Sequence, residues 1–204
     1  MKEFYEDVWR ELPSELPPYA FRRRLAFLLG RVAPGDRVLD VGCGEGAFCA
    51  ELAAAGARPV GVEVAEHAVR RARARHPGLR FEAATPHGPL AFDDAQFDVI
   101  WTSEVIEHVA DTARWLSELR RVLRPGGYLL VTTPYHGRFK AALVGLTAFE
   151  SHFDPLGQHL RFYTRRSLRT LLEGFGFEDV RIATAGGPPL LRETLLAQAR
   201  RTRF

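Results

Sequence analysis

The sequence predicts an α/β protein: a doubly wound, Rossmann-like parallel sheet with helices on both of its faces. Short apolar runs alternate with stretches of helical periodicity over most of the chain, and a glycine-rich turn follows the first apolar run. Strands that alternate with helices form parallel sheets, because the helix returns the chain to the start of the next strand. The 204 residues are 46% hydrophobic and 26% charged, which is typical of a globular domain. We therefore expect one domain over residues 1–204.

Five apolar runs in the first part of the chain are expected to form strands of this sheet. They cover residues 37–41, 59–64, 79–83, 97–102 and 128–132. Helical periodicity precedes and separates them, over residues 3–11, 18–32, 47–55, 65–75 and 112–123. This order predicts a core of alternating strands and helices.

Two segments depart from the alternation. Residues 1–32 form N-terminal helices with an apolar stripe of Phe4, Tyr5, Val8 and Trp9, which predicts either a lid over a ligand site or a permanently docked helix. Residues 134–160 fit neither periodicity and are treated as an insertion. Beyond it we expect a helix over 164–174 and a strand over 178–185, while periodicity leaves 190–201 open between strand and helix.

Composition excludes several classes of protein. The formal net charge is only +3, so no polyanionic partner is required. Two cysteines, Cys43 and Cys49, are too few for a disulfide framework or a cysteine zinc site. No apolar run reaches the ~18–20 residues of a membrane span, and the acidic, amphipathic start lacks the layout of a signal peptide. We expect a cytoplasmic protein without a transmembrane segment.

A glycine loop follows the first predicted strand, in the sequence Asp40-Val41-Gly42-Cys43-Gly44-Glu45-Gly46. Glycine lets the backbone turn tightly and lets a ligand approach its amides. Ligands of such sheets bind at the C-terminal ends of the strands. The glycines alone also satisfy a dinucleotide fingerprint ending at Ala47, with Glu63 at the spacing of a ribose ligand. A nicotinamide oxidoreductase is therefore the alternative class.

Asp40 favours a cationic ligand over a pyrophosphate, because a carboxylate before the loop opposes an anion. The pattern Asp-x-Gly-x-Gly-x-Gly resembles the first motif of class I S-adenosylmethionine-dependent methyltransferases. Three further motifs agree with that family in order and spacing: an acid ending the second strand at Glu63, Phe97-Asp98-Val99-Ile100, and Leu123-Arg124-Pro125-Gly126-Gly127. The resemblance runs from about residue 37 to 131 and implies a sheet of seven strands.

The resemblance also implies which residues contact S-adenosylmethionine. Asp40 would face the methionine part of the cofactor, and Glu63 would accept hydrogen bonds from the ribose hydroxyls. The full set implied for the cofactor is Asp40, Gly42, Cys43, Gly44, Gly46, Glu63, Val64 and Ser103. The carboxylate with which the family often holds adenine is missing near Thr85–Pro86, so no adenine ligand is assigned.

A second cluster, Glu104-Val105-Ile106-Glu107-His108, follows the fourth predicted strand. If it forms the first turn of a helix, Glu104, Glu107 and His108 share one face. Three interpretations remain open. His108 removes a proton from the acceptor, oriented by a carboxylate such as Glu104; the three side chains bind a divalent metal; or the carboxylates cap a helix and His108 only packs.

This cluster resembles those of ubiquinone-pathway O-methyltransferases and of small-RNA 2′-O-methyltransferases. In the small-RNA family the two glutamates, the histidine and a later histidine hold magnesium or manganese. The resemblance implies the ligand set Glu104, Glu107, His108 and His159, with His152 as the fallback for the last position. Oxygen-rich ligation favours Mg²⁺ or Mn²⁺.

The predicted function is methylation of a hydroxyl on a phenolic, sugar or lipid-like small molecule. Related enzymes place acceptor-binding elements after the fifth strand, where the insertion 134–160 is apolar with a basic start. It favours an apolar acceptor or a weak peripheral membrane contact. Aromatics interleaved with basic residues, as in RNA-binding surfaces, are not evident. An RNA 2′-O-methyltransferase and an N- or C-methyltransferase remain the alternatives.

Overall fold

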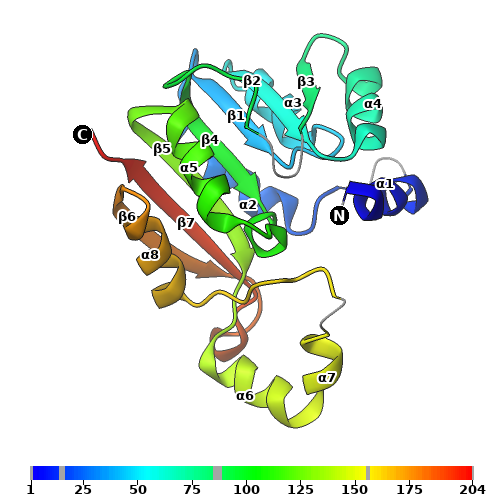
Figure 1. Ribbon diagram of the computed structural model, residues 1–204, viewed down its shortest axis with the longest axis vertical. Coiled ribbons are helices and arrows are strands. Elements are labelled where there is room, and N and C mark those ends of the chain that lie inside the picture. The colour runs from blue at the N-terminus through cyan, green and yellow to red at the C-terminus, as the bar shows by residue number, and fades with distance from the viewer. Residues whose placement is uncertain (1, 14–16, 85–88, 155–156, 204) are drawn as a thin grey trace.

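The computed structural model describes residues 2–13, 17–84, 89–154 and 157–203. Within these residues the chain builds a sheet of seven strands in the order β3-β2-β1-β4-β5-β7-β6 (Figure 1). The strands are β1 (Arg37–Val41), β2 (Arg58–Glu63), β3 (Arg80–Ala83), β4 (Phe97–Ser103), β5 (Leu123–Pro134), β6 (Phe177–Ala185) and β7 (Thr194–Arg201). The predicted Rossmann-like α/β fold with seven strands is confirmed.

Strands β1 to β5 are parallel, whereas β7 runs antiparallel to both β5 and β6. The sheet is therefore mixed rather than wholly parallel. The last segment, left open between strand and helix, is strand β7, and every residue from Thr194 to Ala199 in it is buried. Pairing on both sides explains this burial, because β7 lies between β5 and β6.

The helices are α1 (Lys2–Glu11), α2 (Phe21–Leu29), α3 (Ala47–Ala54), α4 (Glu66–Arg75), α5 (Thr112–Val122), α6 (Arg138–Thr147), α7 (Phe149–His152) and α8 (Arg165–Gly174), with short 3₁₀ turns η1 (Ile106–His108) and η2 (Pro189–Leu191). All except α6 and α7 agree with the predicted positions to within a few residues; these two lie in the insertion, where no helix was predicted. Among the described residues, no helix combines the length and apolar character needed to cross a membrane.

Alternation along the strands divides the core between the two faces of the sheet. Val38 packs with α2 and α3, while its neighbour Leu39 packs with α5 and α8. The same alternation places Trp101 on the first face and Ile100 on the second, both with no exposed surface. Successive side chains of a strand point to opposite faces, so each strand contributes to both cores and the sheet is covered on both sides.

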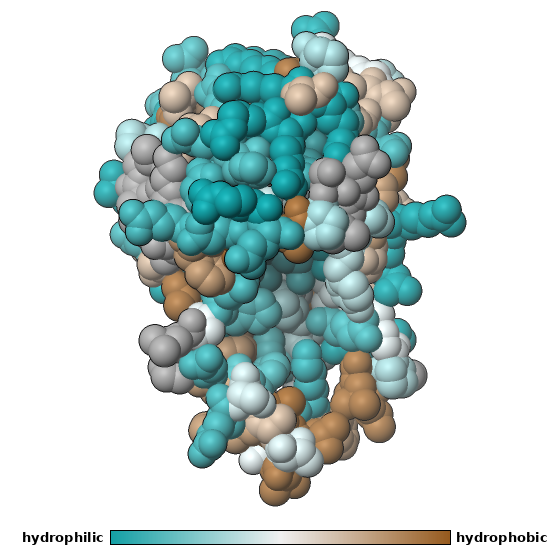
Figure 2. Space-filling model, turned by 90° about the vertical axis from the view of Figure 1, so that its right-hand side faces the viewer, coloured by the Kyte–Doolittle hydropathy of each residue, from teal (hydrophilic) through white to brown (hydrophobic). Residues whose placement is uncertain are grey.

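The insertion forms helices α6 and α7, which project beyond the C-terminal end of β5 (Figure 1). The outer face of α6 is apolar and exposed: Phe139, Leu143 and Leu146 are 64%, 51% and 87% exposed. Figure 2 shows this apolar tip at the bottom of the molecule, separated from the body above by a hollow. The insertion therefore forms one wall of the region outside the strand ends, where ligands bind in such sheets.

Candidate functional site

The glycine loop joins β1 to α3 in left-handed conformations that glycine accepts readily. Gly42 has φ 79° and Gly44 has φ 53°. A Cβ on Gly42 would lie 2.4 Å from Val105 Cγ2, and a Cβ on Gly44 would lie 2.8 Å from the ring of Trp9. The two glycines are therefore required by the packing of the loop as well as by its turn.

Glu63 is held rigidly at the end of β2. Its Oε2 accepts a hydrogen bond from the Gly44 amide at 3.2 Å, and its Oε1 accepts from the amides of Val64 and Ala65 at 2.7 and 3.1 Å. Burial raises the pKa of Glu63, although the three amides oppose this shift. The carboxylate nevertheless lines a cavity, so it is presented in a fixed orientation to a ligand there.

Asp40 lies under the loop rather than facing the cavity. It is fully buried, and the Cys49 thiol donates a hydrogen bond to its Oδ2 at 3.4 Å. Burial and, to a smaller extent, the charge of the nearby Glu63 raise its pKa to about 7. Among the described residues the cavity is lined by Gly42, Cys43 and Gly44 but not by Asp40 or Gly46. The resemblance placed Asp40 against the cofactor; in the structure it supports the loop from below.

The cavity has a volume of about 700 Å³ and runs along the ends of β1, β2 and β4. Such a volume suits a ligand of the size of a nucleoside derivative. Val64 and Ser103, both expected cofactor contacts, line it, as do Ala84 and Leu90. Thr85–Pro86, where no adenine carboxylate was found, lie outside the described residues.

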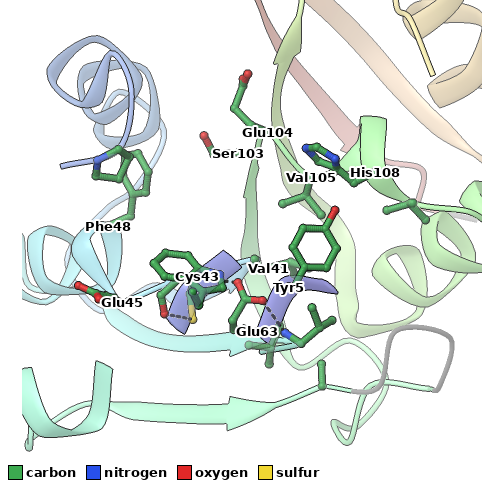
Figure 3. Close-up of a pocket in the computed structure, with 18 of the residues that line it drawn as sticks. Tyr5, Val41, Cys43, Glu45, Phe48, Glu63, Ser103, Glu104, Val105 and His108 are labelled. Carbon is green, nitrogen blue, oxygen red and sulfur yellow. Dashed lines mark hydrogen bonds between the residues drawn. The ribbon is translucent and has the colours of Figure 1, made fainter. Parts of the chain in front are cut away.

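Helix α1 enters this cavity from the side of α4. Tyr5 lies between Glu63 and His108 (Figure 3), with its ring centroid 6.0 Å from that of His108. Burial and, to a smaller extent, the charges of Glu63 and Glu107 raise the pKa of Tyr5 to about 12. The Glu6 carboxylate accepts a hydrogen bond from the His67 amide at 3.1 Å, in the first turn of α4. The negative charge of Glu6 thus docks helix α1 at the N-terminus of α4, where an anion is favoured.

Arg24 on α2 is a residue that the sequence analysis missed, because it stands in an ordinary basic run. Its side chain is only 4% exposed although it lines the cavity. Its Nη2 lies 3.2 Å from Glu104 Oε1, its Nη1 donates to Ser103 Oγ at 3.4 Å, and its Nε is buried without a hydrogen-bond partner. A buried cation beside a ligand cavity is a candidate anion contact.

The cluster after β4 does not form the first turn of one helix, so the expectation that Glu104, Glu107 and His108 share a face is wrong. Glu104 has φ 56°, in the left-handed region, and only Ile106–His108 form a 3₁₀ turn. The left-handed conformation directs the Glu104 side chain toward Arg24 and toward Thr132, whose hydroxyl donates a hydrogen bond to Glu104 Oε1 at 2.9 Å. Strained backbone of this kind concentrates at functional sites.

Glu107, His108 and His159 do converge. Each offers one ligand atom, and these atoms lie within 4.8 Å of one another. Among the described residues Glu104 is not part of this group, and neither is the fallback ligand His152. The predicted metal set is therefore reduced in the structure to one carboxylate and two imidazoles that a cation could share.

The hydrogen bonds define the state of His108. The carbonyl of Gln158 can only accept, so the 2.8 Å contact with His108 Nδ1 places a proton on Nδ1. Burial lowers the pKa of His108, which leaves Nε2 unprotonated near neutral pH. Nε2 lies 3.8 Å from Glu107 Oε1. A neutral imidazole with a fixed tautomer can serve as a base or as a metal ligand.

Glu107 is the most perturbed carboxyl of the cluster. It is 1% exposed, and the Thr133 hydroxyl donates to its Oε2 at 2.9 Å, whereas Oε1 is buried without a hydrogen-bond partner. Burial and the charge of Glu104 raise its pKa to about 8. An unpartnered buried oxygen of this kind requires a proton or a cation.

Comparison with known proteins identifies the family. The profile of the family described as methyltransferase domain matches residues 8–182. A probable S-adenosylmethionine-dependent methyltransferase of Mycolicibacterium smegmatis is 36% identical over 165 residues, which cover 78% of this chain and 60% of the relative. A ubiquinone biosynthesis O-methyltransferase of Dinoroseobacter shibae is 36% identical over 153 residues, covering 72% and 61%. The chain belongs to the methyltransferase domain family, and it spans about 60% of the length of these relatives.

Solved structures share the fold at lower identity. Phosphoethanolamine N-methyltransferase 2 of Haemonchus contortus in complex with S-adenosyl-L-methionine has a TM-score of 0.74 at 17% identity, over 89% of this chain and 53% of the other. The [4+2]-cyclase SpnF has a TM-score of 0.71 at 21% identity, over 94% of this chain and 86% of the other. The two names describe different chemistries, so the fold alone does not define the reaction.

Proposed function

We propose that this protein transfers a methyl group from S-adenosylmethionine to a hydroxyl oxygen of a small molecule. The observation that carries the proposal is the pairing of two side chains along one cavity: the fixed carboxylate of Glu63 and the neutral, singly oriented imidazole of His108. Glu63 suits the hydroxyls of a ribose, and His108 suits the proton of an acceptor hydroxyl. The relatives named as S-adenosylmethionine-dependent methyltransferases support the donor.

The residues of the cavity fit such a donor. S-adenosylmethionine supplies an electrophilic methyl group on a sulfonium, together with an amino acid end that carries a carboxylate. Arg24 has a buried Nε without a partner at the cavity wall, and we assign it to that carboxylate. We assign the loop at Cys43 and Gly44 to contact with the amino acid chain of the ligand. Ala84 and Leu90 provide an apolar surface in the same cavity.

His108 is assigned the acceptor proton. Its Nδ1 is fixed on the carbonyl of Gln158, so Nε2 is the atom that accepts the proton as the oxygen is methylated. Positioning the two reactants in line supplies much of the rate. Glu104 holds Arg24 in place at 3.2 Å, so it is assigned as a positioning residue for Arg24 rather than as the orienting partner of His108.

A divalent metal at Glu107, His108 and His159 is the second form of this proposal. The unpartnered Oε1 of Glu107 fits a cation, because metal binding would replace the proton that the raised pKa retains. One carboxylate and two imidazoles fit Mn²⁺ better than Mg²⁺, which prefers oxygen ligands. An ion held by Glu107, His108 and His159 would supply a lower pKa to the acceptor hydroxyl.

Turnover with labelled S-adenosylmethionine tests both forms. The acceptors are a panel of phenols, sugars and short RNAs, each with and without chelator. We expect methylation of a small hydroxyl compound, and a loss on the order of 10²- to 10⁴-fold in His108→Ala, the usual contribution of a general base. His67→Ala, on α4, is the matched control and should retain activity.

The chelator separates the two forms. If His108 acts alone, chelator has no effect and His159→Ala remains active. If a metal takes part, chelator abolishes turnover, Mn²⁺ restores it, and His159→Ala is inactive. Methylation of RNA alone, or turnover that is unchanged in His108→Ala, contradicts the proposal.

A further inference from the structure

Lys140 occupies an unusual place for this chain. Lysine occurs only at positions 2 and 140, although the chain has 28 basic residues. Lys140 is the third residue of α6 and interacts electrostatically with Glu104, His136 and His152. Lys140 is partly buried, whereas Phe139, Leu143 and Leu146 of the same helix are exposed.

The charge of Lys140 is not compensated. Among the described residues, no carboxylate lies within ion-pair distance of its ammonium. Glu104, the carboxylate with which it interacts, is already paired with Arg24 at 3.2 Å. A partly buried cation without a counter-ion is unfavourable unless a ligand supplies the negative charge.

The surroundings of Lys140 add to this positive character. Helix α6 starts at a cap residue, Gly137, that offers no side-chain acceptor, and its first turn contains no acidic residue. The first amides of a helix carry partial positive charge and have no partner within the helix. A Cβ on Gly137 would lie 3.0 Å from the Tyr135 hydroxyl, so this hydroxyl lies against the helix start as a further donor.

His136 provides an independent observation at the same place. It precedes the helix cap, is only 8% exposed, and has a buried Nδ1 without a hydrogen-bond partner. Its Nε2 lies 3.1 Å from Nε2 of His152. A buried polar atom in this condition requires a partner.

We propose that Lys140, together with His136 and the start of α6, binds an anionic group of the methyl acceptor, either a carboxylate or a phosphate. The acceptor is then an acidic hydroxy compound whose charged end lies at α6 and whose hydroxyl lies at His108. The assignment of this ligand to the acceptor rests on the proposed methyl transfer; the binding of an anion at Lys140 does not.

Binding of simple aromatic probes tests the proposal without requiring turnover. Benzoate, phenyl phosphate and the neutral isostere benzamide are titrated by calorimetry or NMR into protein saturated with S-adenosylhomocysteine. We expect at least one anion to bind 10-fold or more tightly than benzamide, and this preference to fall below about 2-fold in Lys140→Gln. Preference for benzoate identifies a carboxylate, and preference for phenyl phosphate identifies a phosphate.

Two variants complete the test. Lys140→Arg keeps the charge and should keep the preference, and Arg166→Gln removes an exposed charge on α8 and should leave it unchanged. Equal binding of the three probes to the wild-type protein, or an anion preference that survives Lys140→Gln, overturns the proposal. If the protein prefers anions but methylates no acceptor, the proposed function is refuted and the anion site is retained. If it methylates an acceptor but shows no preference for anions, the anion site is refuted and the proposed function is retained.

Discussion

The two ends of the site are built in different ways. At the cofactor end, backbone amides fix Glu63, and the glycine loop is packed against Val105 and Trp9. At the acceptor end, polar atoms are left without partners, as for Glu107 Oε1 and His136 Nδ1. At the cofactor end, Glu63 and the glycine loop are therefore fixed before a ligand binds, although Arg24 Nε lacks a partner there, whereas the acceptor end is satisfied only by a proton, a metal or a substrate.

Gly42 is the position where the two ends touch, and its substitution should give the largest effect. A side chain there is strained at φ 79° and meets Val105 Cγ2 at 2.4 Å. We expect Gly42→Ala to lower the free energy of unfolding by about 2–4 kcal/mol, since both backbone strain and overpacking add, and to weaken binding of S-adenosylhomocysteine. Urea denaturation and calorimetry measure the two effects.

Two further variants sharpen this result. Gly78→Ala is the control, because no atom lies within 4 Å of the added Cβ. Adding Val105→Ala to Gly42→Ala should recover the part of the loss that comes from overpacking. A Gly42→Ala protein as stable as Gly78→Ala would show that the two ends are not coupled through this contact.

Asp40 should give a smaller effect, which depends on pH. Burial raises its pKa from 3.8 to about 7, so between these values the folded protein holds a proton that the unfolded chain has lost. Stability therefore falls as the pH rises from about 4 through about 7. Asp40→Asn removes this loss, and we expect it to be more stable than the wild type by about 1–3 kcal/mol at pH 8.

Urea midpoints at pH 5 and pH 8 provide the measurement. The advantage of Asp40→Asn should be smaller at pH 5, because only part of the interval between the two pKa values lies below that pH. Parallel pH profiles for the two proteins would mean that Asp40 is not a buried acid, and that the cofactor end is less rigid than its hydrogen bonds indicate.

Helix α1 should give the smallest and most local effect. We propose that it is a lid, because Tyr5 lies in the cavity beside Glu63 and Glu6 docks the helix on α4. S-adenosylhomocysteine should slow amide exchange in α1, and Glu6→Gln should speed exchange with or without ligand. Identical exchange in α1 in the two states would instead describe a permanently docked helix.

Most strands and helices of this molecule could be predicted from the sequence, but β7, α6, α7 and the irregular segments could not. The strands β1 to β6, the glycine loop and the place of Glu63 follow from alternation and spacing, which local backbone geometry enforces. The direction of the Glu104 side chain could not be predicted, because it depends on the left-handed backbone conformation of that single residue. Arg24 was missed because its role depends on burial against β4. The sequence does not indicate which arginine of a basic run is buried.

Calorimetric titration with S-adenosylhomocysteine, compared with NADH, tests the central claim most directly. S-adenosylhomocysteine should bind the wild-type protein, and Glu63→Ala should weaken this binding by about 1–3 kcal/mol, the cost of losing hydrogen bonds to a charged group. Glu82→Ala, on the neighbouring strand β3, should bind like the wild type. NADH should not bind. Binding of NADH with no response to S-adenosylhomocysteine would contradict the account.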